Sequence, residues 1–512
     1  MLKFYTRFFL GCASALLLVS SPALHAASSA ALQQSAKRSE VSVVRVNSAN
    51  QSYDFFRPWA KRNAFERHGL GAVLAGNRVL VTAELVANHN DIELERAESG
   101  EKVSAKVLCV DYEANLALLA PVDDGEGNKF FAGLKGVEIG TESVVGDRLN
   151  LLQLESNDAL VQTPGPITTI EVGRYQLEGH RFLLYRMSLP LQFREGSFTA
   201  PAIDRNGKLA GLMMRYDSRS QTLELVAGPV IAHFLHDFDA HPQGKYQGFP
   251  RGGLDYASLR DPQLRHYAKL PGGSSDGVYI TDVADAGPAA VAGIRAGDVL
   301  TEVAGQAIDQ DGNFADPLYG RINLSHLLTK AFVGDKLPVK ILRDGQAQSL
   351  QLTLSHKAPE DYVIPPYVLD AGPRYLIAGG LIFQELSRQY LKEWGGDWQK
   401  QAPQRLVYLD RYQSALVQDG RRRVVILSNV LPTASNVGYE DLNYLVVKAI
   451  NGHSLGSLDD LAKALAEKPE DGFYRVEFED FPREIFLDSA HLSEEDAKIQ
   501  RTYGLPELQR LN

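Results

Sequence analysis

The chain has 512 residues, of which 44% are hydrophobic and 23% charged, with a formal net charge of -10. This length exceeds one ordinary hydrophobic core, so we expect two to four domains, and the composition is that of a globular protein rather than a disordered one. The negative charge argues against nucleic acid or an anionic membrane surface as the main partner. The 44 glycines and 24 prolines are dispersed, which favours many short strands and turns over a helix bundle.

The first 26 residues have the pattern of a signal peptide. Lys3 and Arg7 precede an apolar run over residues 8–19, which is shorter than the roughly 18 residues that a membrane span needs. We therefore predict cleavage, with a membrane anchor as the alternative, and a flexible segment over residues 27–39.

Cleavage changes the net charge from -10 to -12 and leaves Cys109 as the only cysteine, so no intrachain disulfide is possible. Apolar neighbours predict that this thiol is buried. An exported, acidic chain without disulfides suits a bacterial periplasm.

Residues 196–201, Gly-Ser-Phe-Thr-Ala-Pro, form a bend of small residues that leads into two apolar strands. Asn206-Gly207 lies between these strands and favours the positive φ angles of a tight hairpin turn. Earlier segments read Gly-Leu-Gly-Ala-Val-Leu at residues 69–74, Thr-Ala-Glu-Leu-Val at 82–86, and Asn-Leu-Ala-Leu-Leu at 115–119. In this order, the segments resemble the protease domain of the HtrA/Deg family. The resemblance implies a trypsin-like double β-barrel over residues 40–240.

The same resemblance places the family's catalytic triad at Leu85, Asn115 and Phe198. Leucine cannot accept a proton, asparagine supplies no charge to orient an imidazole, and phenylalanine is no nucleophile. Ser197, one residue earlier, is the fallback nucleophile, but it lacks a base to activate it. We therefore predict no catalytic residues and a pseudoprotease rather than an enzyme, with Phe198 filling the former cleft.

Residues 286–300, Ala-Gly-Pro-Ala-Ala-Val-Ala-Gly-Ile-Arg-Ala-Gly-Asp-Val-Leu, predict a short helix begun by proline and ended by glycine, followed by a strand. This run resembles the signature of PDZ domains, which implies a PDZ domain over residues 248–357. PDZ domains bind peptides by strand addition beside a helix. By position, the loop for a peptide carboxylate is Arg251, Gly252, Gly253 and Leu254. Leu324 and Leu328, four apart on the expected groove helix, line the side-chain pocket or belong to the core.

The remainder contains the strand Gly-Gly-Leu-Ile-Phe at residues 379–383 and the segment Asn-Val-Gly-Tyr-Glu at 436–440. These features resemble the divergent second PDZ domain of plant-type Deg proteases. We expect a linker over residues 358–372, this second PDZ-type domain over 373–490, and a charged helical tail over 491–512. The resemblance implies that the second domain helps to assemble oligomers.

The predicted fold is mainly β with α+β modules: a trypsin-like double β-barrel followed by two PDZ-type domains. The predicted function is that of an exported pseudoprotease that binds peptide segments or C-termini of envelope proteins as a scaffold, adaptor or chaperone-like holder. The alternatives are an active serine endopeptidase in periplasmic protein quality control and a regulatory subunit of an active relative. We expect no cofactor, no metal, no nucleic acid and no stable membrane insertion. A trimer-based homo-oligomer or ordinary core packing would both explain the aromatic residues Tyr53, Phe55, Phe56, Trp59 and Phe65.

Overall fold

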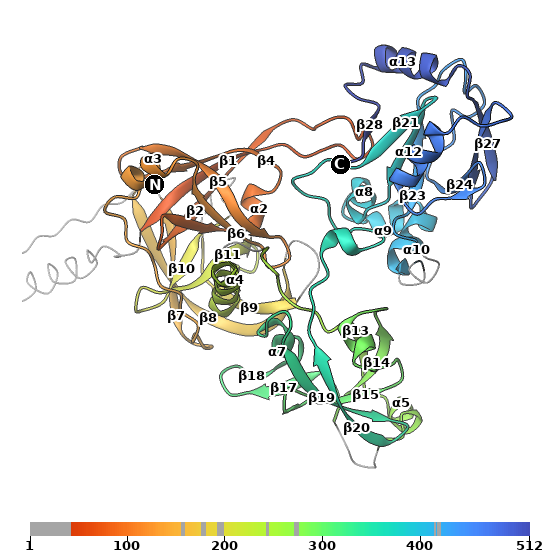
Figure 1. Cartoon of the computed structure of the whole chain (residues 1–512). Helices are drawn as coiled ribbons and strands as arrows, with labels where there is room; N and C mark the ends of the chain where they lie inside the picture. The colour runs from red at the N-terminus through yellow and green to blue at the C-terminus, as the bar shows by residue number, and fades with distance from the viewer. Residues whose placement is uncertain are drawn as a thin grey trace, which may run out of the picture. The chain divides into compact units, whose positions relative to one another are not determined.

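The computed structural model describes residues 42–154, 159–175, 181–191, 199–241, 245–270, 276–413, 416 and 421–512. The predicted signal peptide and the positions of Ser197 and Phe198 lie outside these ranges. The described strands form two closed six-stranded barrels, one six-stranded and one eight-stranded open sheet, and a two-stranded sheet (Figure 1). This arrangement confirms the mainly-β class, a trypsin-like double barrel followed by two PDZ-type domains. Within the described ranges, no helix is both long and apolar enough to cross a membrane.

The first barrel closes in the strand order β1-β2-β3-β6-β5-β4. Side chains of β1 alternate between buried and half-buried, because successive residues of a strand point to opposite faces. The elements of this barrel are β1 (Val43–Asn50), β2 (Phe65–Leu74), β3 (Arg78–Val81), α2 (Ala83–Val86), β4 (His89–Glu95), β5 (Lys102–Asp111), β6 (Leu116–Pro121) and α3 (Asp124–Phe130).

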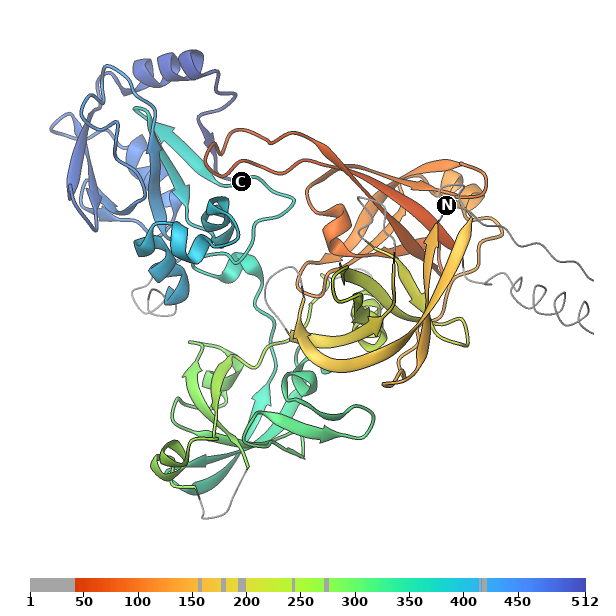
Figure 2. The same ribbon diagram turned by 180° about the vertical axis from the view of Figure 1, so that it is seen from behind.

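The second barrel closes in the order β10-β11-β12-β9-β8-β7, and Figure 2 shows both barrels from behind. Its elements are β7 (Arg148–Leu154), β8 (Leu160–Arg174), β9 (Arg181–Ser188), β10 (Pro201–Ile203), β11 (Leu209–Asp217), β12 (Thr222–Ala227) and the helix α4 (Gly228–Ala240). The predicted hairpin is confirmed: β10 pairs antiparallel with β11. Gly207 has a φ of +79° in the turn, and the Asp204 carboxylate accepts hydrogen bonds from the N–H groups of Asn206 and Lys208.

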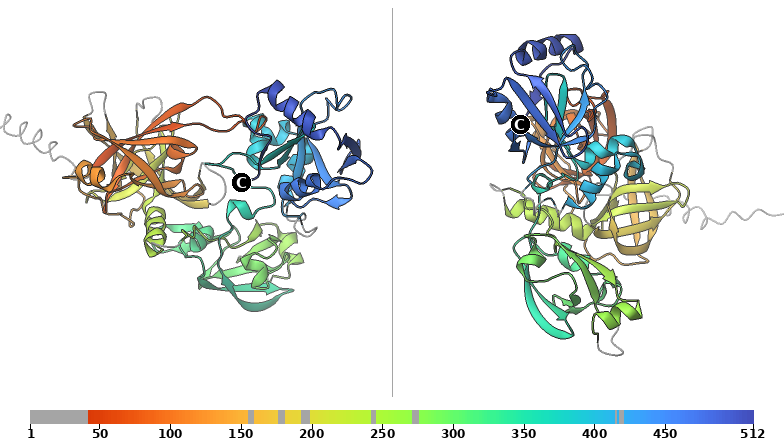
Figure 3. Two further views of the ribbon diagram at one scale, coloured as in Figure 1. Left: turned by 45° about the horizontal axis from the view of Figure 1, so that its top comes forward. Right: turned by 90° about the vertical axis from the view of Figure 1, so that its right-hand side faces the viewer.

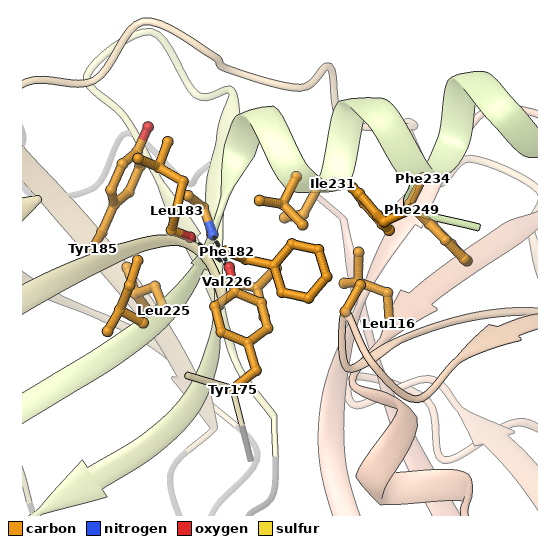
Figure 4. Close-up of a cluster of buried hydrophobic side chains, with 14 of the residues drawn as sticks. Leu116, Tyr175, Phe182, Leu183, Tyr185, Leu225, Val226, Ile231, Phe234 and Phe249 are labelled. Atoms are coloured by element: carbon orange, nitrogen blue, oxygen red, sulfur yellow. Dashed lines mark hydrogen bonds between the residues drawn. The ribbon is translucent and has the colours of Figure 1, made fainter. Parts of the chain in front are cut away.

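A buried hydrophobic cluster fills the second barrel and reaches the first through β6 (Figure 4). Leu116 and Leu118 belong to this cluster, whereas Ala117 and Leu119 of the same strand belong to the core of the first barrel. The rings of Tyr175 and Phe182 lie 5.0 Å apart, and Phe182 contacts Phe249 edge-on at 4.8 Å. Because alternate residues of β6 serve different clusters, this strand joins the two barrel cores.

The first PDZ-type domain has the sheet order β13-β14-β15-β19-β20, with β16 paired to β15 and with β17 and β18 as a separate hairpin. β13 is therefore an edge strand. The elements are β13 (Leu254–Ser258), α5 (Pro262–Tyr267), β14 (Val278–Val283), α6 (Pro288–Val291), β15 (Val299–Val303), β16 (Gln306–Ala307), β17 (Asn313–Asp316), β18 (Gly320–Asn323), α7 (Ser325–Thr329), β19 (Lys336–Arg343) and β20 (Gln346–Thr353).

The second PDZ-type domain has the sheet order β27-β26-β24-β23-β22-β21-β28, with β25 on β24 (Figure 3, cyan to blue). Strand β28 comes from the segment that the sequence indicated as a tail. The elements are η1 (Pro359–Asp361), β21 (Tyr375–Ala378), β22 (Leu381–Glu385), α8 (Arg388–Leu391), η2 (Lys392–Trp394), α9 (Trp398–Gln401), α10 (Gln404–Arg411), β23 (Val425–Val430), β24 (Leu445–Ile450), β25 (His453–Ser454), α12 (Leu458–Ala466), β26 (Phe473–Phe478), β27 (Glu484–Asp488), α13 (Leu492–Tyr503) and β28 (Gln509–Arg510).

The aromatic residues before β2 pack within the chain. Phe55 is 4% exposed, and the Phe56 ring meets Trp394 edge-on with ring centres 4.8 Å apart. Trp59 contacts Tyr375 at 6.4 Å. Phe56 and Phe65 are 37% and 42% exposed, so the choice between core packing and a homo-oligomer stays a prediction.

Candidate functional site

Leu85, the residue predicted to occupy the position of the family's catalytic base, lies in the core of the first barrel. It is on the short helix α2 and is fully buried among residues such as Val81 and Leu119. A leucine packed in this way contributes to stability but has no atom that can carry a proton.

Asn115 is the last residue of the turn between β5 and β6 and has a left-handed φ of +53°, a conformation that asparagine tolerates better than most residues. Its side chain is fully buried, and the Oδ1 atom accepts a hydrogen bond from the Glu84 N–H at 3.0 Å. The Nδ2 atom has no hydrogen-bond acceptor within the described part of the chain. Asn115 therefore holds the start of α2 in place and fixes the backbone on which Leu85 lies.

Glu84 is a titratable residue beside these positions that the sequence analysis did not single out. Burial raises the pKa of its carboxyl group, against the opposing charges of Arg67 and Arg215. Arg67 also donates a hydrogen bond from Nη1 to the Glu84 carbonyl oxygen. A carboxylate next to the expected base position was visible in the sequence, but only the fold shows that it is half-buried and close enough to Arg67 and Arg215 to feel their charges.

The bend that carries Ser197 and Phe198 is described only from Thr199 onward. Thr199 is buried, and its carbonyl oxygen accepts a hydrogen bond from the Leu70 N–H at 3.0 Å. The next residue, Ala200, accepts a hydrogen bond from the Met213 N–H at 2.8 Å. The assignment of Leu85, Asn115, Phe198 and the fallback Ser197 as triad positions stays a prediction.

The first PDZ-type domain has an open strand edge where a peptide can be added. No residue of β13 is buried, and β13 pairs only with β14 among the described strands. The Gly252 and Gly253 N–H groups, just before β13, donate to no acceptor within the described residues. Two backbone donors at the head of an open edge are the arrangement that captures a peptide carboxylate.

The predicted carboxylate loop, residues 251–254, is shaped by contacts that only glycine allows. Gly253 has a φ of +68°, and a Cβ atom there would lie 3.1 Å from Cδ of Pro288. A Cβ atom on Gly252 would lie 3.1 Å from Cδ1 of Leu328, so the loop lies against the half-buried Leu328 of α7. The Gly252 carbonyl accepts the Ala289 N–H at 3.1 Å, which links the loop to the helix of the signature run.

The remaining predicted peptide-binding residues have different roles. Leu324 is 2% exposed and belongs to the core, so it does not line the groove. Leu254 is half-buried at the start of β13. The Arg251 guanidinium donates to Glu113 Oε1 at 2.5 Å and lies over the Tyr362 ring at 5.8 Å. Arg251 is thus already paired with a carboxylate of the chain.

The Gly-Asp pair of the signature has a structural explanation. Asp298 is 2% exposed, and its carboxylate accepts hydrogen bonds from Arg343 and from the Arg295 N–H. This pairing fixes the turn between α6 and β15. Across the described residues, no group of three or more His, Cys, Asp and Glu side chains is arranged to hold a metal ion.

Comparison with known proteins agrees with this architecture. Two PDZ domain families match the chain, one over residues 259–354 and the other over residues 364–509. Protease Do-like 2, chloroplastic, of Arabidopsis thaliana is 26% identical over 468 residues, which cover 91% of this chain and 74% of the relative. Protease Do-like 4, mitochondrial, of the same plant is 23% identical over 467 residues, covering 91% and 84%.

Solved structures also match at low identity. The HtrA-type protease AlgW with a decapeptide is 18% identical, with 63% of this chain and 97% of that chain covered and a TM-score of 0.47. The serine endoprotease from Yersinia pestis is 18% identical, with coverage of 64% and 98% and a TM-score of 0.41.

These comparisons correct one prediction. The prediction that the chain is not an enzyme is wrong, because relatives aligned over nine-tenths of the chain are named proteases. The names of these relatives refer to a chloroplast and a mitochondrion, so the bacterial periplasm stays a prediction. With a double barrel, two PDZ domain matches and homology to the plant Deg proteases, the chain is similar to the HtrA/Deg protease family.

Proposed function

We propose that this HtrA/Deg-like chain binds extended segments or C-termini of other proteins at the open edge of β13 in its first PDZ domain. The observation that supports this proposal is the edge itself: the residues of β13 are half-buried or exposed, and the N–H groups of Gly252 and Gly253 at its head have no acceptor among the described residues. The added peptide would form main-chain hydrogen bonds with β13 and place its carboxylate at these two groups.

The side of the groove opposite β13 is formed by α7. Leu328 is half-buried and lies against Gly252, so it is placed to contact the last side chain of a peptide. Asn323, just before this helix, donates from Nδ2 to the Tyr256 hydroxyl at 2.8 Å, which ties the helix side of the groove to β13. An apolar C-terminal residue is the chemistry that this pocket favours.

A panel of fluorescent peptides with free C-termini tests the proposal by anisotropy with the full chain. We expect binding by peptides with an apolar last residue and at least about tenfold weaker binding when the carboxylate is amidated, because a charge-assisted hydrogen bond is lost. Gly253→Val should abolish binding, since Val would collide with Pro288 in a strained backbone.

The matched control is Gly305→Val. Gly305 has a similar φ of +78° but no neighbour within 4 Å of a Cβ atom, and it lies in a turn of the same domain. The Gly305→Val substitution should introduce a comparable backbone strain and leave the affinity for the peptide unchanged. Equal affinities for Gly253→Val and the unmodified chain would refute the proposed site.

A second candidate function is peptide-bond hydrolysis, which is favoured by the relatives that are named proteases. Its substrates would be the same segments, which the predicted export signal assigns to proteins of the cell envelope. The test combines cleavage of unfolded casein with labelling by a serine-directed fluorophosphonate. Activity that disappears in Ser197→Ala would identify the nucleophile, and activity that persists would assign hydrolysis to another residue.

A further inference from the structure

The two PDZ domains repeat the same strand register. In the first, Leu254 pairs with Val283, and a bulge follows Asp255; in the second, Leu381 pairs with Val430, and a bulge follows Ile382. Each register begins with Gly-Gly-Leu, at residues 252–254 and 379–381. Strand β22 is therefore the counterpart of β13, the strand to which we propose that a peptide adds.

The outer edges of these two strands differ. β13 is the last strand of its sheet, whereas β22 is covered by β21 along Tyr375 to Ala378, which is itself covered by β28. Four of the five residues of β22 are buried, compared with none of β13. The strand edge that is open in the first domain is thus occupied in the second.

The direction of β21 is that of a PDZ ligand. It runs antiparallel to β22 and its C-terminal residue, Ala378, lies beside Leu381 at the head of that strand. A bound C-terminal peptide likewise pairs along the edge and ends at the loop that precedes it. In this chain, Ala378 continues directly into that loop through Gly379.

The side chains of β21 fill the space between β22 and α12. Leu376 and Ala378 are 6% and 3% exposed, and they share one buried cluster with Leu458 and Leu461 of α12 and Phe383 of β22. Helix α12 contacts both β21 and β22. Alternate residues of β21 therefore occupy the places where alternate side chains of a peptide would lie.

The loop at the head of β22 is also occupied. The Gly379 N–H donates to the Asp496 carboxylate of α13 at 2.7 Å, and the Gly379 carbonyl accepts from Asn436 Nδ2 at 2.9 Å. In the first domain, the matching N–H of Gly252 has no acceptor among the described residues. A carboxylate of the chain thus lies at a loop N–H group, as the carboxylate of a peptide does.

Residues after α13 hold β21 from its other edge. The Ile377 N–H donates to the Leu508 carbonyl at 2.8 Å, and Arg374 donates to the Leu511 carbonyl from both Nε and Nη2. Arg374 also pairs with Asp459 at the start of α12 and with Glu385 of β22. These contacts fasten β21 at the groove helix, at the groove strand and at the C-terminal segment.

We propose that the second PDZ domain is self-liganded: β21 is a tethered ligand in the groove between β22 and α12, and residues 492–511 retain it there. Peptides from other proteins then bind this chain at one PDZ groove rather than two. The occupancy of the second groove stands without the proposed function of the first, and only the stoichiometry of peptide binding rests on that function.

Hydrogen exchange of the full chain, read by mass spectrometry with residue-level fragmentation, tests the occupied edge directly. We expect amides of β22 to exchange at least about tenfold more slowly than those of β13, because both edges of β22 are paired. A saturating C-terminal peptide should slow exchange in β13 and leave β22 unchanged. Fast exchange in β22, or new protection of β22 by the peptide, would overturn the proposal.

A displacement experiment asks whether β21 behaves as a ligand. Leu376→Asp places a charge in the buried cluster and should expel β21, so that exchange in β22 rises while β24 and β26 stay protected. The free peptide Arg-Tyr-Leu-Ile-Ala, the sequence of residues 374–378, should then restore protection of β22 in trans. The control peptide Arg-Tyr-Asp-Ile-Ala should not.

Failure of the first peptide to protect β22, while β24 and β26 remain protected, would show that β21 is an ordinary strand of the sheet. If Leu376→Asp unfolds the whole domain, the exchange rates of the unmodified chain decide the question. Peptide stoichiometry separates the two proposals. If one peptide binds per chain and this binding is lost in Gly253→Val, both proposals are supported. If a peptide still binds the Gly253→Val variant and protects β22, the self-occupancy of the second groove is overturned. If no peptide binds and β22 exchanges slowly, only the proposed function of the first groove is overturned.

Discussion

The two Gly-Gly-Leu loops of this chain have the same sequence and lead into strands of the same register, yet one is open and the other is closed. At Gly252 and Gly253 the N–H groups have no acceptor in the described structure, and β13 has one free edge. At Gly379 both backbone groups are bonded, and β22 is paired on both sides. Whether a Gly-Gly-Leu loop can bind a peptide therefore depends on the segments that flank the loop, and the loop sequence alone does not determine it.

The largest expected difference between the two grooves is in stability. Leu376→Ala should lower the free energy of unfolding of the second domain by about 2–5 kcal/mol, because it leaves a cavity in the hydrophobic core beside Leu458 and Leu461. The counterpart in the first domain is Leu328→Ala, at a half-buried residue, which should cost about 1 kcal/mol or less and instead weaken peptide binding.

Urea unfolding followed by domain-resolved hydrogen exchange measures both effects. Equal destabilisation of the two domains by these two substitutions would contradict the contrast between a filled groove and an open one.

A smaller effect is expected at the arginine that fastens β21. Arg374→Met should destabilise the second domain by about 1–3 kcal/mol, because it removes charge-assisted hydrogen bonds to Glu385 and Asp459. Exchange of the β21 and β28 amides should rise first. Arg475→Met is the control: this exposed arginine lies 3.7 Å from Glu484, a surface pair worth about 0–1 kcal/mol. If both substitutions had the same effect, Arg374 would have no special role in retaining β21.

The smallest predicted effect is an opposite response of the two domains to pH. In the first, burial and the nearby Lys330 lower the pKa of His326 to about 4 from 6.5. The unfolded chain then binds more protons between these values, so stability falls as the pH drops from about 6.5 to 4. In the second, burial raises the pKa of Asp496 to about 6 from 3.8, although the Gly379 hydrogen bond opposes this shift. The folded state then binds more protons, so stability falls as the pH rises from about 4 to 6.

Hydrogen exchange of α7 and α13 at several pH values, corrected for intrinsic rates, measures these slopes. His326→Gln should flatten the response of the first domain, and Asp496→Asn that of the second. Glu494→Gln, at an exposed residue of α13, is the control and should leave both slopes unchanged. Parallel slopes in the unmodified chain would contradict this prediction.

Local patterns in the sequence predicted the parts of the fold that depend on local chemistry. Asn206-Gly207 predicted the β10–β11 hairpin, because the turn needs a positive φ, and the run from Gly287 to Leu300 predicted a PDZ helix and strand, because proline and glycine bound the helix. The resemblance at Gly379 to Phe383 indicated a strand, which is β22.

The closure of the second groove could not be predicted in this way. Asp496 lies 117 residues from Gly379, and Arg374 lies 137 residues from Leu511. Nothing in the charged pattern of residues 491–512 distinguishes a docked helix from a solvated one, because docking rests on Ile499, Leu505 and one carboxylate. The same holds for Glu84, whose partial burial near the charges of Arg67 and Arg215 arises from strands that are distant in sequence.

The pairing of β28 with β21 has a consequence for biosynthesis. The first PDZ domain can complete its sheet once β20 has emerged from the ribosome, but the second must wait for Arg510 before its outer edge is covered. Contacts that span so many residues form slowly, and an uncovered strand edge pairs readily with other chains. During synthesis, the nascent second domain therefore passes through an interval in which β21 is exposed to aggregation, and chaperone protection has its greatest value in that interval.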